Sequence, residues 1–484
     1  MPLSTDRASD HRLHGPLLAG LALGYLTTRL PGLLSIPPFL DESIHLAAAR
    51  ATHSGNLSVG LTLGKWLTTH CYGLVLRVFG ESLVVARMVP VVAGLITTLA
   101  LFEIGRCSGD GNGTTRGFFS ALVYIVTPYA FFYDRLALTD PFLTAALALL
   151  LLLTFRTIAA PNFGNRATLA LLMMLCPMLK FNGLLLVLIP AVVVAAGGTS
   201  VDRRTAARIL LPSYASALPV LAVFGLLGRP GLEGGKLMTW RSVREASTHV
   251  ALNVAEACAT FWSMLGPGLF LLLTVGIAAV LVGFFGPAVR RRVCAAAAVA
   301  CVIVTPYIVL FRVWYPRYLV PAMVPLSLAG GDILTALFRR AAQPRRRTAR
   351  AWLAAALLAL AATATTTIVM MVRPLDSSFP AKIRNQFIRG WPSGFGLREA
   401  VAHLHQLAAR TPQGIRVLRS PHWDVPLQSL DLLRRDLGPK AETVTLRHWH
   451  ENGIAAEISK QLDAHPPPAY LLFNSACPYP EDIN

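Results

Sequence analysis

Long apolar runs alternate with short polar connections along the first three quarters of the chain. A membrane-spanning helix needs about 20 apolar residues, and eleven stretches approach that length. They cover about 14–34, 83–105, 117–133, 139–156, 167–179, 182–198, 208–228, 264–286, 293–311, 318–338 and 351–372. The fifth and sixth are short and are separated only by Lys180 and Phe181, so together they could form one tight re-entry. The pattern predicts an all-α multispanning membrane domain over residues 1–372, with about eleven transmembrane helices.

The pattern changes after residue 372. Helical periodicity over 397–410, 427–436 and 451–463 alternates with short β-type runs over 415–419, 443–446 and 469–473. Alternating helices and strands are typical of an α/β fold. We therefore expect residues 373–484 to form a small soluble α/β domain.

The composition agrees with a membrane protein. Of the 484 residues, 54% are hydrophobic and 14% are charged, against roughly 25% charged in soluble domains; the mean hydropathy is +0.54. Residues 1–372 carry 17 of the 19 net positive charges. A surplus in the hydrophobic part is usually a signal for orientation in the membrane, so we expect no nucleic-acid partner.

Arginines are concentrated in alternate connections. They lie at 106–116, 156–166, 203–208, 290–292 and 339–350. The positive-inside rule places these connections and the N-terminus in the cytoplasm. The first long loop, 35–82, and the segment 373–484 would then lie outside a cytoplasmic (inner) membrane. The same assignment puts charged residues from several loops on the external face: Asp41, Glu42, Asp134, Arg135, Asp140, Lys180, Arg312 and Arg317.

Two adjacent carboxylates, Asp41 and Glu42, follow the first span. Ionisable groups at a membrane boundary are costly and often functional. One of them could be a general base for an acceptor hydroxyl or amine, or a ligand of a divalent cation. Alternatively, they could cap the N-terminus of a helix beginning here. His45, one turn later, could join such a site or be an interfacial histidine.

Further candidates lie in the later external connections. Asp140 and Arg135 follow an aromatic run, and an arginine can hold phosphate oxygens with its planar fork. The same residues could instead form an ion pair in an interfacial aromatic belt. Lys180 could contact a phosphate or extend its ammonium group to the interface. Arg317, next to Tyr318, is a candidate phosphate ligand.

Four stretches carry a resemblance to a known family. Asp-Glu-x-x-His at 41–45 resembles the acidic first-loop motif of GT-C glycosyltransferases, in the branch of protein O-mannosyltransferases and the lipid A aminoarabinose transferase. Residues 80–90, the segment 134–141 (Asp-Arg-Leu-Ala-Leu-Thr-Asp-Pro) and the segment 317–322 (Arg-Tyr-Leu-Val-Pro-Ala) resemble later elements of that branch in the same order. One departure is Gly-Lys-Trp at 64–66, where many relatives have Gly-Lys-Pro-Pro-Leu.

The resemblance implies a membrane glycosyltransferase. It would move a sugar from a polyprenyl-phosphate donor to a lipid, glycan or protein acceptor at the outer membrane face, with inversion by a single displacement. Asp41 is then the expected base, or a ligand, with Asp140, of a divalent cation such as Mg²⁺ or Mn²⁺. The other expected site residues are Glu42 as an assisting acid and Arg135, Lys180, Arg317, Tyr318 and His45 around the donor. The lipid phosphate is the leaving group, so no nucleotide cofactor is expected; membrane lipid is the other expected partner.

Two other functions compete with this interpretation. A multispanning lipid or glycan transporter usually has internal repeats and charges near the membrane midplane. Here the sequence has no evident repeat, and the charges lie at the external ends of spans. A non-catalytic envelope scaffold would leave the external acids without a role, but the missing loop prolines are compatible with it.

Overall fold

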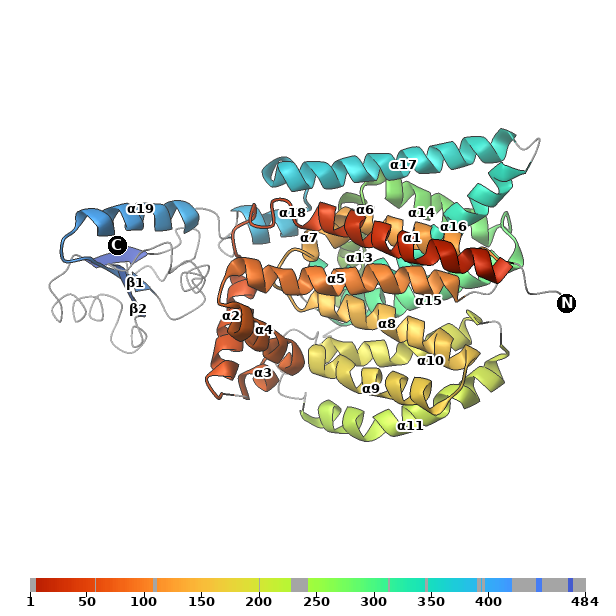
Figure 1. The fold of residues 1–484 in the computed structure, drawn as a ribbon, viewed down its shortest axis with the longest axis horizontal. Helices are drawn as coiled ribbons and strands as arrows, with labels where there is room; N and C mark the ends of the chain where they lie inside the picture. The colour runs from red at the N-terminus through yellow and green to blue at the C-terminus, as the bar shows by residue number, and fades with distance from the viewer. Residues whose placement is uncertain are drawn as a thin grey trace.

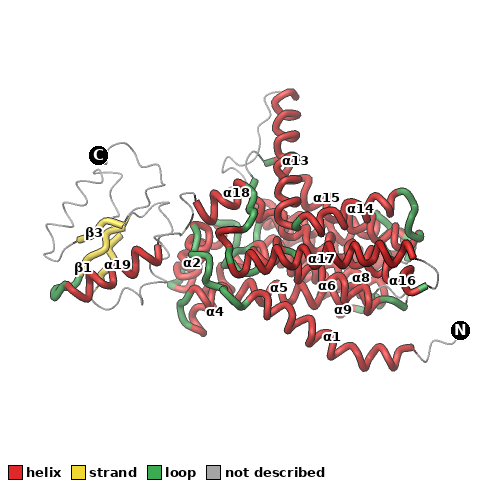
Figure 2. The backbone as a smooth tube through the Cα atoms, turned by 90° about the horizontal axis from the view of Figure 1, so that it is seen from above, coloured by secondary structure: helices red, strands yellow, loops and turns green. Residues whose placement is uncertain are grey.

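The computed structural model describes residues 6–56, 58–107, 111–199, 201–227, 243–311, 314–343, 347–389, 393, 397–419, 441–445 and 469–472. Up to residue 389 the described regular structure is almost entirely helical (Figures 1 and 2). Before residue 200 the helices are α1 (Asp6–Arg29), α2 (Leu40–His53), α3 (Ser58–Thr62), α4 (Trp66–Phe79), α5 (Leu83–Arg106), α6 (Gly113–Val126), α7 (Pro128–Tyr133), α8 (Asp140–Ala159), α9 (Phe163–Leu179), η1 (Phe181–Leu188) and α10 (Ile189–Ala195). After it come α11 (Arg203–Leu227), α13 (Val243–Leu265), α14 (Pro267–Leu281), α15 (Pro287–Leu310), η2 (Pro316–Ala322), α16 (Met323–Ala342), α17 (Arg347–Val372), η3 (Pro374–Asp376), α18 (Ala381–Arg384) and η4 (Asn385–Arg389).

Among the described residues, six helical stretches are long and apolar enough to cross a membrane. They are Leu83–Arg106, Asp140–Ala159, Arg203–Val223, Pro287–Leu310, Pro316–Ala342 and Arg347–Val372. A seventh would be the pair α13–α14, in which the chain bends by 116° at the break between the two helices. The chain is therefore a multi-pass membrane protein.

The expected count of eleven spans is not confirmed, because apolar windows do not register helix breaks. The stretch 117–133 is divided at Thr127, since α6 ends at Val126 and a new helix starts at Pro128. The helices after residue 162, α9 and η1–α10, are shorter apolar helices. Residues 243–263, which lie between two expected spans, belong to α13, which projects from the bundle (Figure 2). Gly266, with φ of +75°, provides the sharp turn into α14.

The centre of the bundle is formed by α5, α6, α8 and α16, which pack on one another. Glycines allow α5 and α6 to approach closely. A Cβ on Gly105 would lie 2.3 Å from the backbone nitrogen of Gly117. Small residues at such crossings are the usual means of packing helices in a membrane, where there is little hydrophobic gain between them.

The segment after residue 396 contains α19 (Leu397–Arg410) and the strands β1 (Ile415–Arg419), β2 (Ala441–Thr445) and β3 (Ala469–Leu472). The strands are parallel in the order β2-β1-β3. One apolar face of α19, including Val401 and Leu404, packs with Ile415 and Val417 of β1. The helix and the strands β1 and β3 occur where the sequence predicts them, and β2 begins two residues before the predicted strand 443–446. The predicted helices 427–436 and 451–463 lie outside the described residues. The organisation of 373–484 as an extracytoplasmic domain stays a prediction.

Candidate active site

The predicted acid Asp41 lies in the first turn of α2, at the end of the bundle that also carries α3 and α4 (Figure 1). The α2 helix begins here because Pro37 and Pro38 hold the preceding chain extended and Phe39 has an extended N-cap conformation. Asp41 is only partly buried, and its carboxylate forms an ion pair with Arg317 of η2. Residues 276 positions apart are therefore in direct contact.

A second ion pair lies beside the first. Lys180, at the junction of α9 and η1, donates to Asp140 Oδ1 over 2.6 Å, and its ammonium lies 4.7 Å from the ring centre of Tyr318. The Arg317 guanidinium lies over Tyr315 and Tyr318, at 4.6 and 5.4 Å. The structure thus brings together five residues expected around the donor or acid site: Asp41, Asp140, Lys180, Arg317 and Tyr318.

Lys65 is a member of this cluster that the sequence interpretation did not include. Its ammonium lies 2.7 Å from His45 Nε2. Burial and the nearby Lys180 charge lower the pKa of Lys65 to about 7, although Asp41 acts in the opposite direction. The one available signal was the Gly-Lys pair at 64–65, where Gly64 takes a φ of +63°.

His45 orients this lysine. Its Nδ1 lies 3.1 Å from the carbonyl oxygen of Ala137, which can only accept, so Nδ1 carries the proton and Nε2 accepts from Lys65. Burial and the Lys65 charge also hold the pKa of His45 well below its usual value, which keeps the ring neutral. His45 is therefore a positioning residue for the Lys65 ammonium.

The cluster has an excess of positive charge. When Lys65 is protonated, as it is below its pKa of about 7, three cations, Lys65, Lys180 and Arg317, face two carboxylates, Asp41 and Asp140. Burial raises the pKa of Asp41, but Arg317 and Lys65 lower it by more, and the net pKa is below the ordinary value. At neutral pH Asp41 is thus ionised, and the arrangement favours binding of one further anion.

Two buried polar atoms mark where such a ligand can bind. Asp140 Oδ2 and the Tyr133 hydroxyl have no hydrogen-bond partner in the described part of the chain. Both residues interact electrostatically with Arg317. Buried polar groups are normally paired with protein or with ordered water, so these two atoms are available for hydrogen bonds to a ligand or to water. Tyr133 was not among the predicted site residues.

Glu42 has a different environment from its neighbour Asp41. Its side chain is fully buried and its two oxygens accept from Arg87 at 2.9 and 2.7 Å and from the Ala137 amide at 2.7 Å. Arg87 also donates to the carbonyl oxygens of Leu33 and Ile36, after α1. Glu42 therefore joins α2, α5 and the 134–138 loop, and its oxygens are occupied. We revise its predicted assisting role to a structural one.

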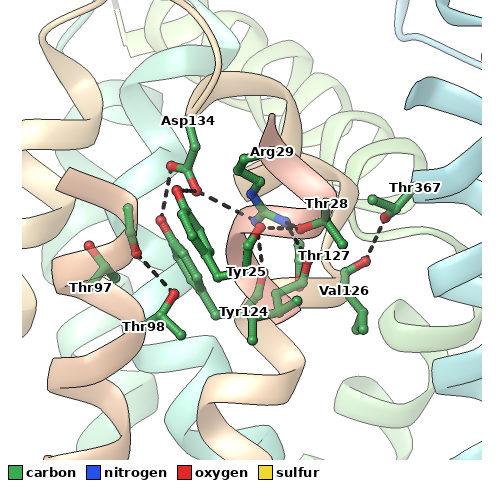
Figure 3. Close-up of polar contacts among 12 residues, drawn as sticks. Tyr25, Thr28, Arg29, Thr97, Thr98, Tyr124, Val126, Thr127, Asp134 and Thr367 are labelled. Atoms are coloured by element: carbon green, nitrogen blue, oxygen red, sulfur yellow. Dashed lines mark hydrogen bonds and ion pairs between the residues drawn. The ribbon is translucent and has the colours of Figure 1, made fainter. Parts of the chain in front are cut away.

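Asp134 and Arg135 have their partners outside the cluster around Asp41 and Arg317. Asp134 accepts from the hydroxyls of Tyr25 and Tyr124 at 3.1 and 3.0 Å and pairs with Arg29 at 3.5 Å (Figure 3). Arg135 donates to the Pro31 carbonyl and stacks 4.5 Å over Phe131. The structure does not bring Arg135 to the cluster, so its predicted phosphate contact has no geometric support.

Gly94 of α5 leaves room for the Asp134 network. A Cβ there would lie 2.0 Å from the Tyr25 hydroxyl and 2.6 Å from Asp134 Oδ2. Gly94→Ala is expected to lower the free energy of unfolding by about 1–3 kcal/mol, the usual cost of overpacking, and to lower the melting temperature in detergent. Gly20→Ala in α1, where a Cβ meets nothing within 4 Å, is the control. Equal melting temperatures for the two variants would show that the network does not hold α5.

The expected divalent cation has no preformed site among these residues, and it stays a prediction. The part of the chain that the structure describes contains no group of three or more His, Cys, Asp or Glu side chains arranged to hold a metal. The two expected ligands, Asp41 and Asp140, are each paired with a cation, Arg317 and Lys180. A divalent ion there would have to displace both, against the repulsion of Lys65.

A family model and several solved structures are similar to this chain. A family model described as dolichyl-phosphate-mannose-protein mannosyltransferase matches residues 64–226. The structure superposes on ArnT from Cupriavidus metallidurans bound to undecaprenyl phosphate, with a TM-score of 0.53, 14% identity, and coverage of 94% of this chain and 89% of that one. The chain has the fold of GT-C glycosyltransferases. The resemblance inferred from the four sequence motifs is thereby confirmed.

A second group of GT-C structures is also similar. The oligosaccharyltransferase AglB from Archaeoglobus fulgidus, in complex with an inhibitory peptide and a dolichol-phosphate, gives a TM-score of 0.53 at 13% identity, with coverage of 89% of this chain and 64% of that one. The same archaeal enzyme has been crystallised with Zn and sulfate, so a metal is compatible with the fold in that protein. No curated protein sequence matches this chain.

Proposed function

We propose that this protein is an integral membrane glycosyltransferase that uses a polyprenyl-phosphate-linked sugar and transfers it to a lipid, glycan or protein acceptor at the outer face of the cytoplasmic membrane. The single observation that carries the proposal is the cluster at the α2 end, where Lys65, Lys180 and Arg317 face two carboxylates. A phosphate leaving group is the ligand that such a cluster favours. The fold and its ligand-bound relatives support a lipid phosphate as its source.

The three cations have separate tasks in the proposed reaction. Arg317 can hold two phosphate oxygens with its planar fork, while Lys65 and Lys180 act as point charges. Negative charge grows on the phosphate as the bond from the anomeric carbon to the phosphate oxygen breaks. Fixed cations aimed at that oxygen stabilise the transition state more than the ground state.

Asp41 is the proposed base. In the described structure it is held as an anion by Arg317. A phosphate that engages Arg317 competes with this ion pair, which leaves Asp41 more basic when the donor is bound. Asp41 then accepts the proton of the acceptor as the acceptor atom bonds to the anomeric carbon and polyprenyl phosphate departs. One displacement of this kind inverts the anomeric configuration.

The first experiment measures both products. Purified protein in detergent is incubated with a panel of polyprenyl-phosphate sugars and candidate acceptors, and the release of polyprenyl phosphate is measured together with sugar transfer. We expect release with at least one donor. Folded protein that releases no lipid phosphate from any donor would contradict the proposal.

Binding of the lipid phosphate is expected to depend on pH through Lys65. In the free protein the pKa of Lys65 is about 7, so the charged form dominates below pH 7 and binding there needs no proton uptake. A bound anion stabilises the charged form and raises this pKa. Above pH 7, binding must take up a proton, and the affinity is expected to fall by up to about tenfold per pH unit.

The measurement is the dissociation constant of undecaprenyl phosphate between pH 7 and 9. In Lys65→Met the affinity is lower at pH 7 and its slope between pH 7 and 9 disappears. His45→Ala, which removes only the partner that orients Lys65, should weaken binding but keep the slope. A Lys65→Met variant with the wild-type slope would exclude Lys65 as the titrating group.

A further inference from the structure

A second charged cluster lies deeper along α16, away from the proposed active site. Asp332 is 15 residues after Arg317, which corresponds to at least about 22 Å at the helical rise of 1.5 Å per residue. Its carboxylate is buried and pairs with Arg116 of α6 at 2.9 Å and Arg292 of α15 at 2.7 Å. Arg116 itself is only 3% exposed.

This cluster borders a cavity of about 590 Å³. Arg339 and Arg340, from the last turn of α16, line the same cavity with Arg116, Arg292 and Asp332. Four arginines and one aspartate thus line this cavity. The positive-inside rule accounts for arginines in a connection, but it does not require them to surround a cavity or one of them to be buried.

An apolar groove of about 380 Å³ adjoins this cavity. It lies between α14, α16 and α17 and is lined by residues such as Val275, Leu337 and Ala355. Phe285 lines both the groove and the arginine cavity. Arg340 lies 4.6 and 4.9 Å over Phe284 and Phe285 and donates to the Phe284 carbonyl over 2.5 Å. A polar cavity and an apolar groove therefore meet at one aromatic pair.

We propose that this combined site binds an anionic phospholipid, separately from the donor site. The arginines bind its phosphate, because guanidinium groups match phosphate oxygens and basic pockets between membrane helices suit acidic head groups. An acyl chain occupies the groove between α14, α16 and α17. The groove distinguishes a lipid from free phosphate, which would use the cavity alone. From the positions of the arginines, the lipid comes from the leaflet expected to be cytoplasmic.

The test uses the full-length protein in nanodiscs or detergent and measures lipid retention by native mass spectrometry and the melting temperature. The probes are phosphatidylglycerol, phosphatidylcholine and inorganic phosphate. Phosphatidylglycerol is expected to bind most tightly and to raise the melting temperature. The R339Q/R340Q variant should lose roughly tenfold or more in phosphatidylglycerol affinity, as expected for two charges at a membrane surface.

Two further variants separate the parts of the site. R203Q/R204Q removes two exposed arginines from the start of α11 that line neither the cavity nor the groove, and should bind phosphatidylglycerol like wild type. Ala355→Phe places a bulky side chain in the groove, which no arginine lines, and should weaken the binding of phosphatidylglycerol. Three results would each overturn the proposal. The first is an equal loss of phosphatidylglycerol affinity in R203Q/R204Q and R339Q/R340Q, and the second is phosphatidylcholine binding as tight as that of phosphatidylglycerol. The third is a rise in melting temperature with inorganic phosphate equal to that with phosphatidylglycerol.

Discussion

Asp41→Asn is expected to lower the rate of sugar transfer by about 10²–10⁴-fold, the usual contribution of a positioned general base. The change keeps the shape of the side chain but removes the charge that accepts the proton. Because Asp41 pairs with Arg317 in the free protein, the amide also frees Arg317 for the phosphate. We therefore expect the affinity for undecaprenyl phosphate to stay equal or increase while turnover is lost.

The matched control is Glu81→Gln. Glu81 belongs to the same first loop, but its side chain is 50% exposed and it pairs with Arg50 outside the cluster. It should keep wild-type turnover, and both variants should melt near the wild-type temperature. Near-normal transfer by Asp41→Asn would remove Asp41 from the reaction, and a common loss of turnover and lipid binding would point to a role in substrate binding.

Arg87→Met is expected to be the most destabilising single change described here. Glu42 and Arg87 are both fully buried, and removal of one partner leaves the other as an unpaired buried charge. Such changes typically cost about 3–5 kcal/mol in the free energy of unfolding. The variant should melt well below wild type, because the carbonyl oxygens of Leu33 and Ile36 also lose their donor.

Arg50→Met provides the comparison, because the Arg50–Glu81 pair is partly exposed and exposed pairs contribute about 0–1 kcal/mol. A double variant, Glu42→Gln with Arg87→Met, should recover part of the loss because no unpaired charge remains. If Arg87→Met melts like Arg50→Met, the structural role assigned to Glu42 is wrong. A Glu42→Gln protein that is stable but inactive would restore the catalytic role predicted from the sequence.

The two adjacent acids illustrate how environment separates chemical roles. Asp41 is partly exposed and faces three cations, whereas Glu42 is enclosed by Arg87 and two backbone amides. The proposed function needs a carboxylate that can accept a proton and reach an acceptor. Of the two adjacent acids, Asp41 has the exposure that this role needs, whereas the oxygens of Glu42 are already occupied.

The sequence was informative wherever the signal is local. Hydropathy is a property of consecutive residues, so it identified the multi-pass class and the positions of α5, α8, α15, α16 and α17. The short motifs at 41–45, 134–141 and 317–322 indicated the GT-C resemblance that the fold confirms. The predicted count of eleven spans is not confirmed, since an apolar window does not show whether a break such as Thr127–Pro128 divides it.

What the sequence determined by itself was the membrane class, the resemblance and a set of charged residues at the ends of spans. Only the tertiary structure decided which members of that set meet. Neighbouring residues on a helix point about 100° apart, so Asp41 and Glu42 face different partners. Those partners come from distant segments: Arg317, Lys180 and Lys65 on one side, Arg87 on the other. The partners of a side chain depend on helix packing, which no local pattern records. For this reason the sequence did not indicate that Lys65 lies in the cluster or that Arg135 lies outside it.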